Sequence, residues 1–174
     1  NRHGGWIPRV VWEHENGELT AGLELRWHRS DHWGKLQYAE NLPSNYDPDF
    51  KFYQYNGERD IYSAFVRETY AINRDLLLNA ELQVVSQSYR INNEKTGKFY
   101  KSYLTTDGKT VGNGDDLFDI NYIFLNPRLG LNYNLDKEQN VYGSLAYTSR
   151  EPRMCNLYDA SSSYSGSVPL FECD

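Results

Sequence analysis

The sequence has few of the aliphatic side chains from which a thick soluble core is built. Hydrophobic residues make up 39% of its 174 residues, but aromatic residues alone account for 15% and the chain has 15 Tyr. Amphipathic rings of this kind are enriched where a protein meets the edge of a membrane. No apolar run approaches the roughly 18 residues of a membrane helix, so a chain of this composition would cross a membrane as β-strands.

The chain also lacks a basic excess and the signatures of common catalytic sites. Its formal net charge of -6 argues against binding a nucleic-acid backbone. It contains no Ser-His-Asp order, no glycine-rich phosphate loop and no zinc signature. His28 and His32 form the only histidine cluster, and on a strand they would lie about 13 Å apart, too far to share one metal ion. We therefore expect no enzyme, no cofactor and no metal site.

What the sequence does contain is a hydrophobic period of two. Apolar side chains occupy every second position from Ile123 to Leu135, with polar side chains and glycine in most of the gaps. A short polar turn at 136–140 follows, and the alternation resumes at 141–148. This pattern is typical of strands with one apolar and one polar face, and two such strands around a short turn form an antiparallel hairpin.

The same reasoning extends along the chain. Further strands are predicted at 6–14, 18–37, 60–72 and 76–90. The connections alternate between short turns and long polar loops, the turns at 15–17, 73–75 and 136–140 and the loops at about 38–59, 91–118 and 154–174. Outer-membrane barrels have this alternation, with short periplasmic turns and longer extracellular loops. We predict an all-β chain, an antiparallel up-and-down meander of about six long strands, in which residues 1–174 form part of a large transmembrane β-barrel. The leucines expected to face lipid are Leu19, Leu23, Leu25, Leu78, Leu82, Leu129, Leu131 and Leu145.

Three segments occur in a characteristic order, Phe124–Tyr133 (FLNPRLGLNY), Val141–Ser144 (VYGS) and Ser149–Arg153 (SREPR). In this order and separation they resemble the barrel of TonB-dependent outer-membrane receptors. Ala64–Tyr70 (AFVRETY) is similar to the preceding hairpin of that family. The resemblance implies a bacterial outer-membrane location and TonB-energised import of a scarce nutrient, such as a ferric siderophore, heme, cobalamin or an oligosaccharide.

The resemblance also implies partners that the chain would meet. They are the TonB complex, reached through a region N-terminal to this one, the lipid and lipopolysaccharide of the outer membrane, and a small-molecule ligand of unspecified identity. Nothing in the chain resembles the family's plug domain, and its last residues, Glu172-Cys173-Asp174, do not form the terminal aromatic strand of the family. Since such barrels have about 22 strands, we expect an internal part of a longer barrel.

Two alternatives stay open on the sequence alone. A passive porin-like channel would share the alternation of strands and turns. A soluble β-sheet carbohydrate-binding module would instead bury the leucine stripes between two sheets.

Candidate ligand residues lie in the predicted loops, where rings for stacking occur beside polar anchors. They are Tyr38, Tyr46, Asp47, Asp49, Tyr53, Tyr55, Tyr100 and Tyr103. Cys155 and Cys173 are the only cysteines. Both fall in the last polar tract, which the topology places outside the cell, so a disulfide between them is favoured over two free thiols.

Overall fold

The computed structural model of the chain describes residues 1–36, 38, 40–41, 43–152, 158–159 and 168–169. All its regular elements are strands. They are β1 (Arg2–Trp6), β2 (Arg9–His14), β3 (Gly17–Lys35), β4 (Lys51–Ala71), β5 (Leu76–Thr96), β6 (Phe99–Tyr100), β7 (Ser102–Leu104), β8 (Thr110–Gly112), β9 (Asp116–Asn134), β10 (Asn140–Ala146), β11 (Tyr158–Asp159) and β12 (Val168–Pro169).

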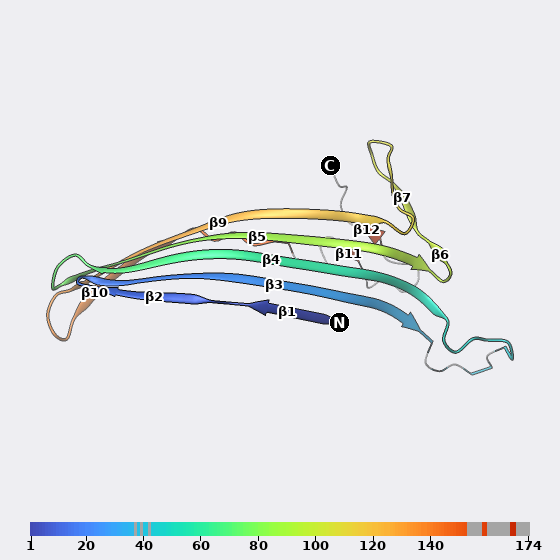
Figure 1. The fold of residues 1–174 in the computed structure, drawn as a ribbon, viewed down its shortest axis with the longest axis horizontal. Coiled ribbons are helices and arrows are strands. Elements are labelled where there is room, and N and C mark those ends of the chain that lie inside the picture. The colour runs from blue at the N-terminus through green and yellow to red at the C-terminus, as the bar shows by residue number, and fades with distance from the viewer. Residues whose placement is uncertain (37, 39, 42, 153–157, 160–167, 170–174) are drawn as a thin grey trace.

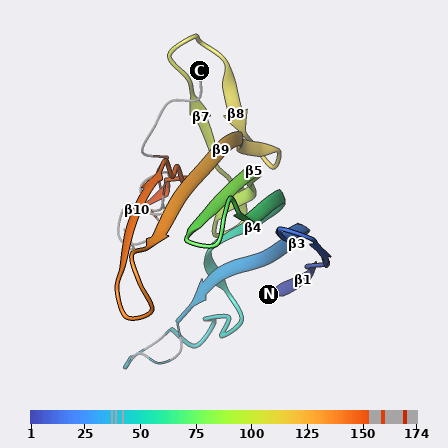
Figure 2. The same cartoon turned by 90° about the vertical axis from the view of Figure 1, so that its left-hand side faces the viewer.

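The long strands form one antiparallel sheet in which chain neighbours are also spatial neighbours. Its order is β1-β3-β4-β5-β9-β10, and β2 pairs with β3 beside β1. Figure 1 shows the four longest strands lying side by side, and Figure 2 shows the sheet twisted and curved along its length. The predicted all-β antiparallel meander is confirmed.

The strands run further than the hydrophobic pattern indicated. β4 begins at Lys51, inside the loop predicted at 38–59, and β5 continues to Thr96, inside the loop predicted at 91–118. The second of these predicted loops also contains the short strands β6, β7 and β8 and the start of β9. Both loop predictions were therefore too long. A strand that leaves the membrane keeps its backbone ladder but no longer needs an apolar side, so its hydrophobic period disappears while the strand continues.

Cross-strand pairing sorts the side chains onto two faces. Leu23 pairs with Ala64, Ala64 with Val84 and Val84 with Leu125, so these four side chains form one row on the same face. We call this side the outward face and the opposite side the lumen face. All eight leucines predicted to face lipid lie on the outward face by this register.

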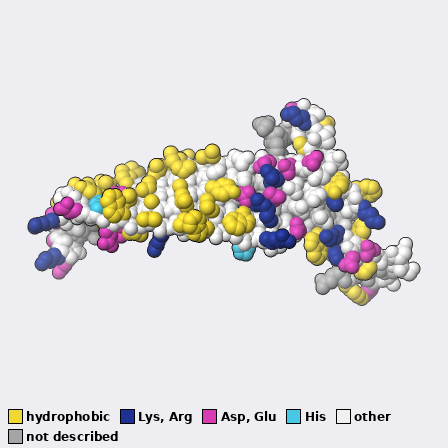
Figure 3. All heavy atoms as spheres, viewed as in Figure 1, with side chains coloured by type: hydrophobic (Ala, Val, Ile, Leu, Met, Phe, Trp, Pro, Cys, Tyr) yellow, Lys and Arg dark blue, Asp and Glu magenta, His cyan; other side chains and the backbone are white. Residues whose placement is uncertain are grey.

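The apolar part of the outward face is a band of limited height. It spans residues 76–84 on β5 and 123–133 on β9, which matches the roughly 9–11 residues of a tilted transmembrane strand. Figure 3 shows the hydrophobic side chains of this face gathered in such a band, with Lys, Arg, Asp and Glu side chains beyond it.

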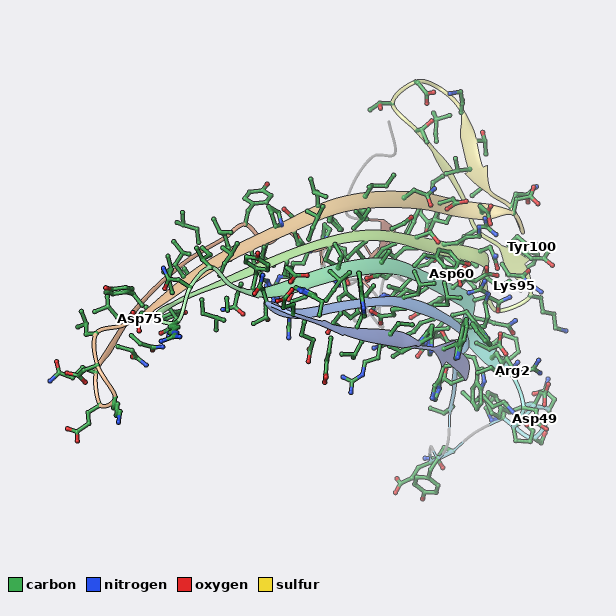
Figure 4. All side chains as sticks on the ribbon, turned by 60° about the vertical axis from the view of Figure 1, so that its left-hand side comes forward. Arg2, Asp49, Asp60, Asp75, Lys95 and Tyr100 are labelled. Carbon is green, nitrogen blue, oxygen red and sulfur yellow. The ribbon has the colours of Figure 1, made fainter. Side chains whose placement is uncertain are left out.

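The two ends of the sheet differ. Short turns lie at one end, where Asp75 is found, and the longer connections lie at the other, where Asp49 is found (Figure 4). In an outer-membrane barrel, the short turns at the Asp75 end would be periplasmic and the longer connections at the Asp49 end extracellular.

One acidic side chain, Glu68, interrupts the apolar band. Its register places Glu68 on the outward face, opposite Leu19 and Ala80. There His14 Nε2 lies 2.8 Å from its carboxylate. A carboxylate on the lipid side is costly unless it has a partner, and His14 supplies one here.

Candidate ligand site

The lumen face carries a basic hollow near the N-terminal edge of the sheet. Its volume is ≈ 520 Å³. Residues of β1, β3 and β4 and Ile7, which follows β1, line it. They are His3, Arg26, His28, Arg59, Ile7 and Ile61, together with Gly4, Gly5 and Trp27. The strand register brings these side chains together, because His28 pairs with both His3 and Arg59 and therefore shares a face with them. Two imidazoles and two guanidinium groups thus border one opening.

Arg59 connects this hollow to the centre of the lumen face. Its guanidinium lies over the ring of Tyr89, 5.1 Å from the centroid, and it forms an ion pair with Glu151. The Tyr89 hydroxyl donates a hydrogen bond to the same carboxylate at 3.0 Å. Arg59 Nε is buried and has no hydrogen-bond partner among the residues that the structure describes. A buried N–H donor of this kind is one that a ligand oxygen could satisfy.

Glu151 reaches Arg59 because the chain turns inward after β10. The Ser149 N–H donates to the side-chain oxygen of Asn126 at 2.8 Å, and Asn126 lies on the lumen face opposite Gln83. This contact brings the SREPR segment over the lumen face. The described part of that segment therefore contributes to the candidate site as well as to the family resemblance.

Beyond Arg59, toward the extracellular end, the lumen face becomes aromatic. A buried cluster there consists of Tyr55, Tyr89, Ile91, Leu117 and Phe118, with Ile120 and Tyr122 packed against it. The His32 ring stacks on Tyr55 with centroids 4.6 Å apart and an interplanar angle of 11°. The site is thus basic on β1, β3 and β4 near the hollow, and aromatic on β4, β5 and β9 toward the extracellular end.

The eight predicted ligand residues do not gather in one place. Tyr38 is 79% exposed in the connection between β3 and β4, whereas the Tyr46 hydroxyl is buried without a hydrogen-bond partner in the described part of the chain. Asp47 accepts a hydrogen bond from the Asp49 N–H at 2.9 Å. The Asp49 carboxylate lies 2.5 Å from Lys35 Nζ, which holds the pKa of Asp49 below its usual range. Both aspartates are therefore engaged in local structure.

The other four tyrosines lie in strands. Tyr53 and Tyr55 belong to β4, and of these only Tyr55 is part of the lumen cluster. Tyr100 in β6 packs under Lys95, whose Nζ is 4.4 Å from the ring centroid. The Tyr103 hydroxyl in β7 donates to buried Glu94 at 3.1 Å. Burial, reinforced by the charge of Glu94 and by this hydrogen bond, raises the pKa of Tyr103 well above its usual value.

Sequence reasoning missed the basic residues of the hollow as a group. His3, Arg26, His28 and Arg59 occupy lumen positions in three strands. A signal for them existed, since Arg26 and His28 fall on the polar side of the alternation that was recognised in β3. The predicted disulfide between Cys155 and Cys173 lies outside the described residues. Among described residues, no group of three or more His, Cys, Asp and Glu side chains could hold a metal ion.

An apolar band of membrane height backed by a polar, charged face defines the wall of a transmembrane β-barrel. No helix in the described part of the chain is long and apolar enough to cross a membrane. The family model described as TonB dependent receptor-like, beta-barrel, matches residues 4–171, so the chain belongs to the TonB-dependent receptors. Neither a curated protein nor a solved structure matches it.

Membership in this family settles the broad functional class. TonB-dependent receptors reside in the bacterial outer membrane, and they are transporters rather than enzymes. The family carries out TonB-energised transport across that membrane. This class replaces the passive channel and the soluble carbohydrate-binding module that the strand pattern alone left open.

Proposed function

We propose that the receptor containing this chain imports an anionic, ring-bearing iron chelate of the ferric siderophore class. The observation that carries the proposal is the basic hollow, where His3, Arg26, His28 and Arg59 meet on the lumen face next to aromatic side chains. Catecholate or carboxylate oxygens of a chelate would accept hydrogen bonds from guanidinium groups, which bind planar anions well.

The arginines of the hollow are only partly neutralised, so they can still bind an anionic ligand. Arg26 pairs with Glu24 at 2.6 Å, and Arg59 pairs with Glu151. A guanidinium has five N–H donors, so one carboxylate does not exhaust it, and the Arg59 Nε–H is buried and unpaired among the described residues.

A neutral oligosaccharide fits this surface less well. Tyrosine rings stack on sugars too, but a neutral sugar would offer no anionic acceptor to the guanidinium N–H groups that Glu24 and Glu151 leave unused. The substrate class therefore follows from the basic groups and not from the rings.

Ligand binding to the full receptor tests the proposal. Equilibrium affinities are measured for an anionic ferric catecholate, a neutral ferric hydroxamate and a maltooligosaccharide, in wild type and in the double variant Arg26→Gln/Arg59→Gln. Hydrogen bonds to charged groups contribute about 1.5–3 kcal/mol each, so the variant is expected to bind the catecholate at least about tenfold more weakly. Arg9→Gln is the matched control, because Arg9 lies on the lumen face outside the hollow. Preferential binding of the oligosaccharide, or an equal loss in the control, would overturn the proposal.

A further inference from the structure

Glu151 places a carboxylate of the chain itself on the donors of the candidate site. Its Oε1 atom forms the ion pair with Arg59 Nη2 and also accepts the hydrogen bond from the Tyr89 hydroxyl at 3.0 Å. The Glu151 side chain is only 16% exposed, although it follows β10 in a segment without regular structure. An anionic ligand that approaches Arg59 therefore meets a position that a carboxylate already occupies.

The ion pair uses only one of two parallel N–H groups. The Nε–H and one Nη2–H of a guanidinium point along the same edge, and this edge binds both oxygens of a carboxylate in bidentate pairs. Here Glu151 contacts Nη2 through a single oxygen, and Gln87 accepts from the same Nη2 at 3.4 Å. Arg59 Nε is buried without a hydrogen-bond partner among the described residues. A ligand with two suitably spaced oxygens could thus bind this edge more completely than Glu151 does.

The Tyr89 hydroxyl is a second donor that does not depend on Glu151 for its position. Burial raises the pKa of Tyr89 to about 12, although the charge of Arg59 opposes this shift. The hydroxyl therefore stays protonated at neutral pH and can donate to any carboxylate beside Arg59. Both donors belong to long strands of the sheet, Arg59 to β4 and Tyr89 to β5.

The segment that carries Glu151 has no such support from strand pairing. Regular pairing with β9 ends at Ala146 in β10, and the Tyr147 N–H still donates to the Pro127 carbonyl at 3.0 Å. Beyond this point the segment is attached to the lumen face by the Ser149–Asn126 hydrogen bond and by the contacts of Glu151. The carboxylate can therefore leave Arg59 without disruption of the sheet.

A ligand anion and Glu151 cannot both remain at full strength on Arg59. Two carboxylates on one guanidinium leave a net negative charge and repel each other in a site of low polarity. In addition, Arg59 Nε is buried, so a ligand oxygen reaches it only when a neighbouring group moves. Binding to this edge therefore requires displacement of the carboxylate that is already there.

We propose that Glu151 is a specificity-determining residue that acts as an internal competitor of the transported anion. A ligand with two adjacent anionic oxygens displaces Glu151 from Arg59 and Tyr89, and residues 149–152 then leave the lumen face. A neutral ligand cannot replace the charge of Glu151, so it leaves the pair intact. This inference rests on the proposed function, because it takes the transported ligand to be an anion bound at Arg59.

Affinity measurements on the full receptor test the competition. A ferric catecholate and a neutral ferric hydroxamate are compared in wild type and in Glu151→Gln, which keeps the size of the side chain and removes its charge. Because hydrogen bonds to charged groups are strong, the variant is expected to bind the catecholate about tenfold more tightly and the hydroxamate unchanged. A variant that had merely lost its fold would bind both ligands more weakly.

Two controls separate competition from a general change of charge. Glu81→Gln also removes a carboxylate from the lumen face, where Glu81 is equally shielded at 16% exposure and pairs with Arg67 and Arg128. It should leave the affinity for the catecholate unchanged. In an Arg59→Gln background, the further change Glu151→Gln should bring no gain, since the competitor acts through Arg59.

The outcomes distinguish this inference from the proposed function. If wild type binds the catecholate better than the hydroxamate but Glu151→Gln brings no gain, the proposed function stands and the competition is overturned. An equal gain in Glu81→Gln, or a gain that persists without Arg59, would also overturn it. If wild type prefers the neutral ligand, the proposed function is wrong and this inference falls with it.

A spin label detects the displacement itself. With Cys155 and Cys173 replaced by Ala, a nitroxide is attached at the exposed position 150, and a gallium catecholate replaces the iron complex because gallium is diamagnetic. Saturation with this complex should increase the mobility of the label, whereas the gallium hydroxamate should not. Equal mobility with and without the catecholate would show that the segment stays in place and would overturn the proposal.

Discussion

Arg59 is the residue at which the contacts of the lumen face converge. It borders the basic hollow, lies over Tyr89, pairs with Glu151 and donates to Gln87 at 3.4 Å. Because Glu151 follows β10 whereas Arg59 belongs to β4, this one ion pair joins parts of the chain that are distant in sequence. The pair therefore affects both stability and the shape of the candidate site.

Replacing Glu151 tests that structural role. Glu151→Gln removes the charge that faces a partly buried arginine, and we expect the free energy of unfolding of the receptor to fall by about 1–3 kcal/mol. Tyr89→Phe removes one hydrogen bond to the same carboxylate but leaves the Arg59–Glu151 ion pair in place, so it should cost less, about 1.5 kcal/mol, the low end of the range for a hydrogen bond to a charged group. Urea unfolding in lipid vesicles measures both changes. A larger effect of Tyr89→Phe would contradict the central place of the Arg59–Glu151 pair.

A second prediction at the residue scale concerns Tyr103, one of the predicted ligand residues, whose hydroxyl donates to Glu94. Burial and the neighbouring carboxylate both favour the neutral phenol, so the folded-state pKa lies above the unfolded value. The stability that this contributes is present below about pH 10 and is lost as the pH rises through the folded-state pKa.

Phenolate absorbance at 295 nm measures this pKa. The difference between wild type and Tyr103→Phe should show no phenolate from Tyr103 between pH 8 and pH 10.5, and Glu94→Gln should lower the pKa of Tyr103 because it removes a negative charge. Ionisation of Tyr103 with the ordinary Tyr pKa of about 10 would show that its hydroxyl is open to solvent.

At the scale of the strand, whether a side chain faces lipid or the barrel interior determines which substitutions its position tolerates. Leu82 and Gln83 are adjacent in β5, but Leu82 belongs to the outward band, whereas Gln83 donates to Ser63 at 3.1 Å on the lumen face. One residue of displacement moves a side chain from lipid to the barrel interior.

Paired arginine substitutions at these two positions test the assignment of faces. Leu82→Arg should destabilise the barrel by about 2–4 kcal/mol, the cost of an arginine on the lipid side near the membrane centre. Gln83→Arg should cost less, about 1 kcal/mol, since it loses the hydrogen bonds with Ser63 and Asn126 in a polar environment. Unfolding in vesicles gives both values, and equal costs would show that the faces are wrongly assigned.

The strands within the membrane could be predicted from the sequence, but their extracellular extensions could not. In β9, strict alternation from Ile123 to Leu135 marks the lipid side, because lipid imposes a period of two. Residues Lys51–Arg59 of β4 have no such period, because water rather than lipid contacts their outward side. The sequence pattern therefore predicted a loop there. The basic hollow was missed for a related reason. It depends on the register of three strands, and the sequence pattern of one strand does not contain that register.

At the scale of the whole molecule, the sheet is one sector of a closed wall. Its outward band exposes large apolar side chains, and β10 and the β1–β2 strand present unpaired edges in the described sheet. Both features are stable only with lipid on one side and further strands at the edges. The family assignment supplies both conditions, since such barrels close and lie in the outer membrane.

The most direct test of this account is the accessibility of β5 in the full receptor embedded in a bilayer. With Cys155 and Cys173 replaced by Ala, single cysteines at successive positions from 78 to 85 are labelled with a nitroxide, and collision with oxygen is compared with collision with a water-soluble nickel complex. We predict a period of two, with high oxygen accessibility at Leu78, Ala80, Leu82 and Val84 and low oxygen accessibility at Asn79, Glu81, Gln83 and Val85. Uniform accessibility, or the opposite phase, would contradict the assignment of this sheet as a lipid-facing barrel wall.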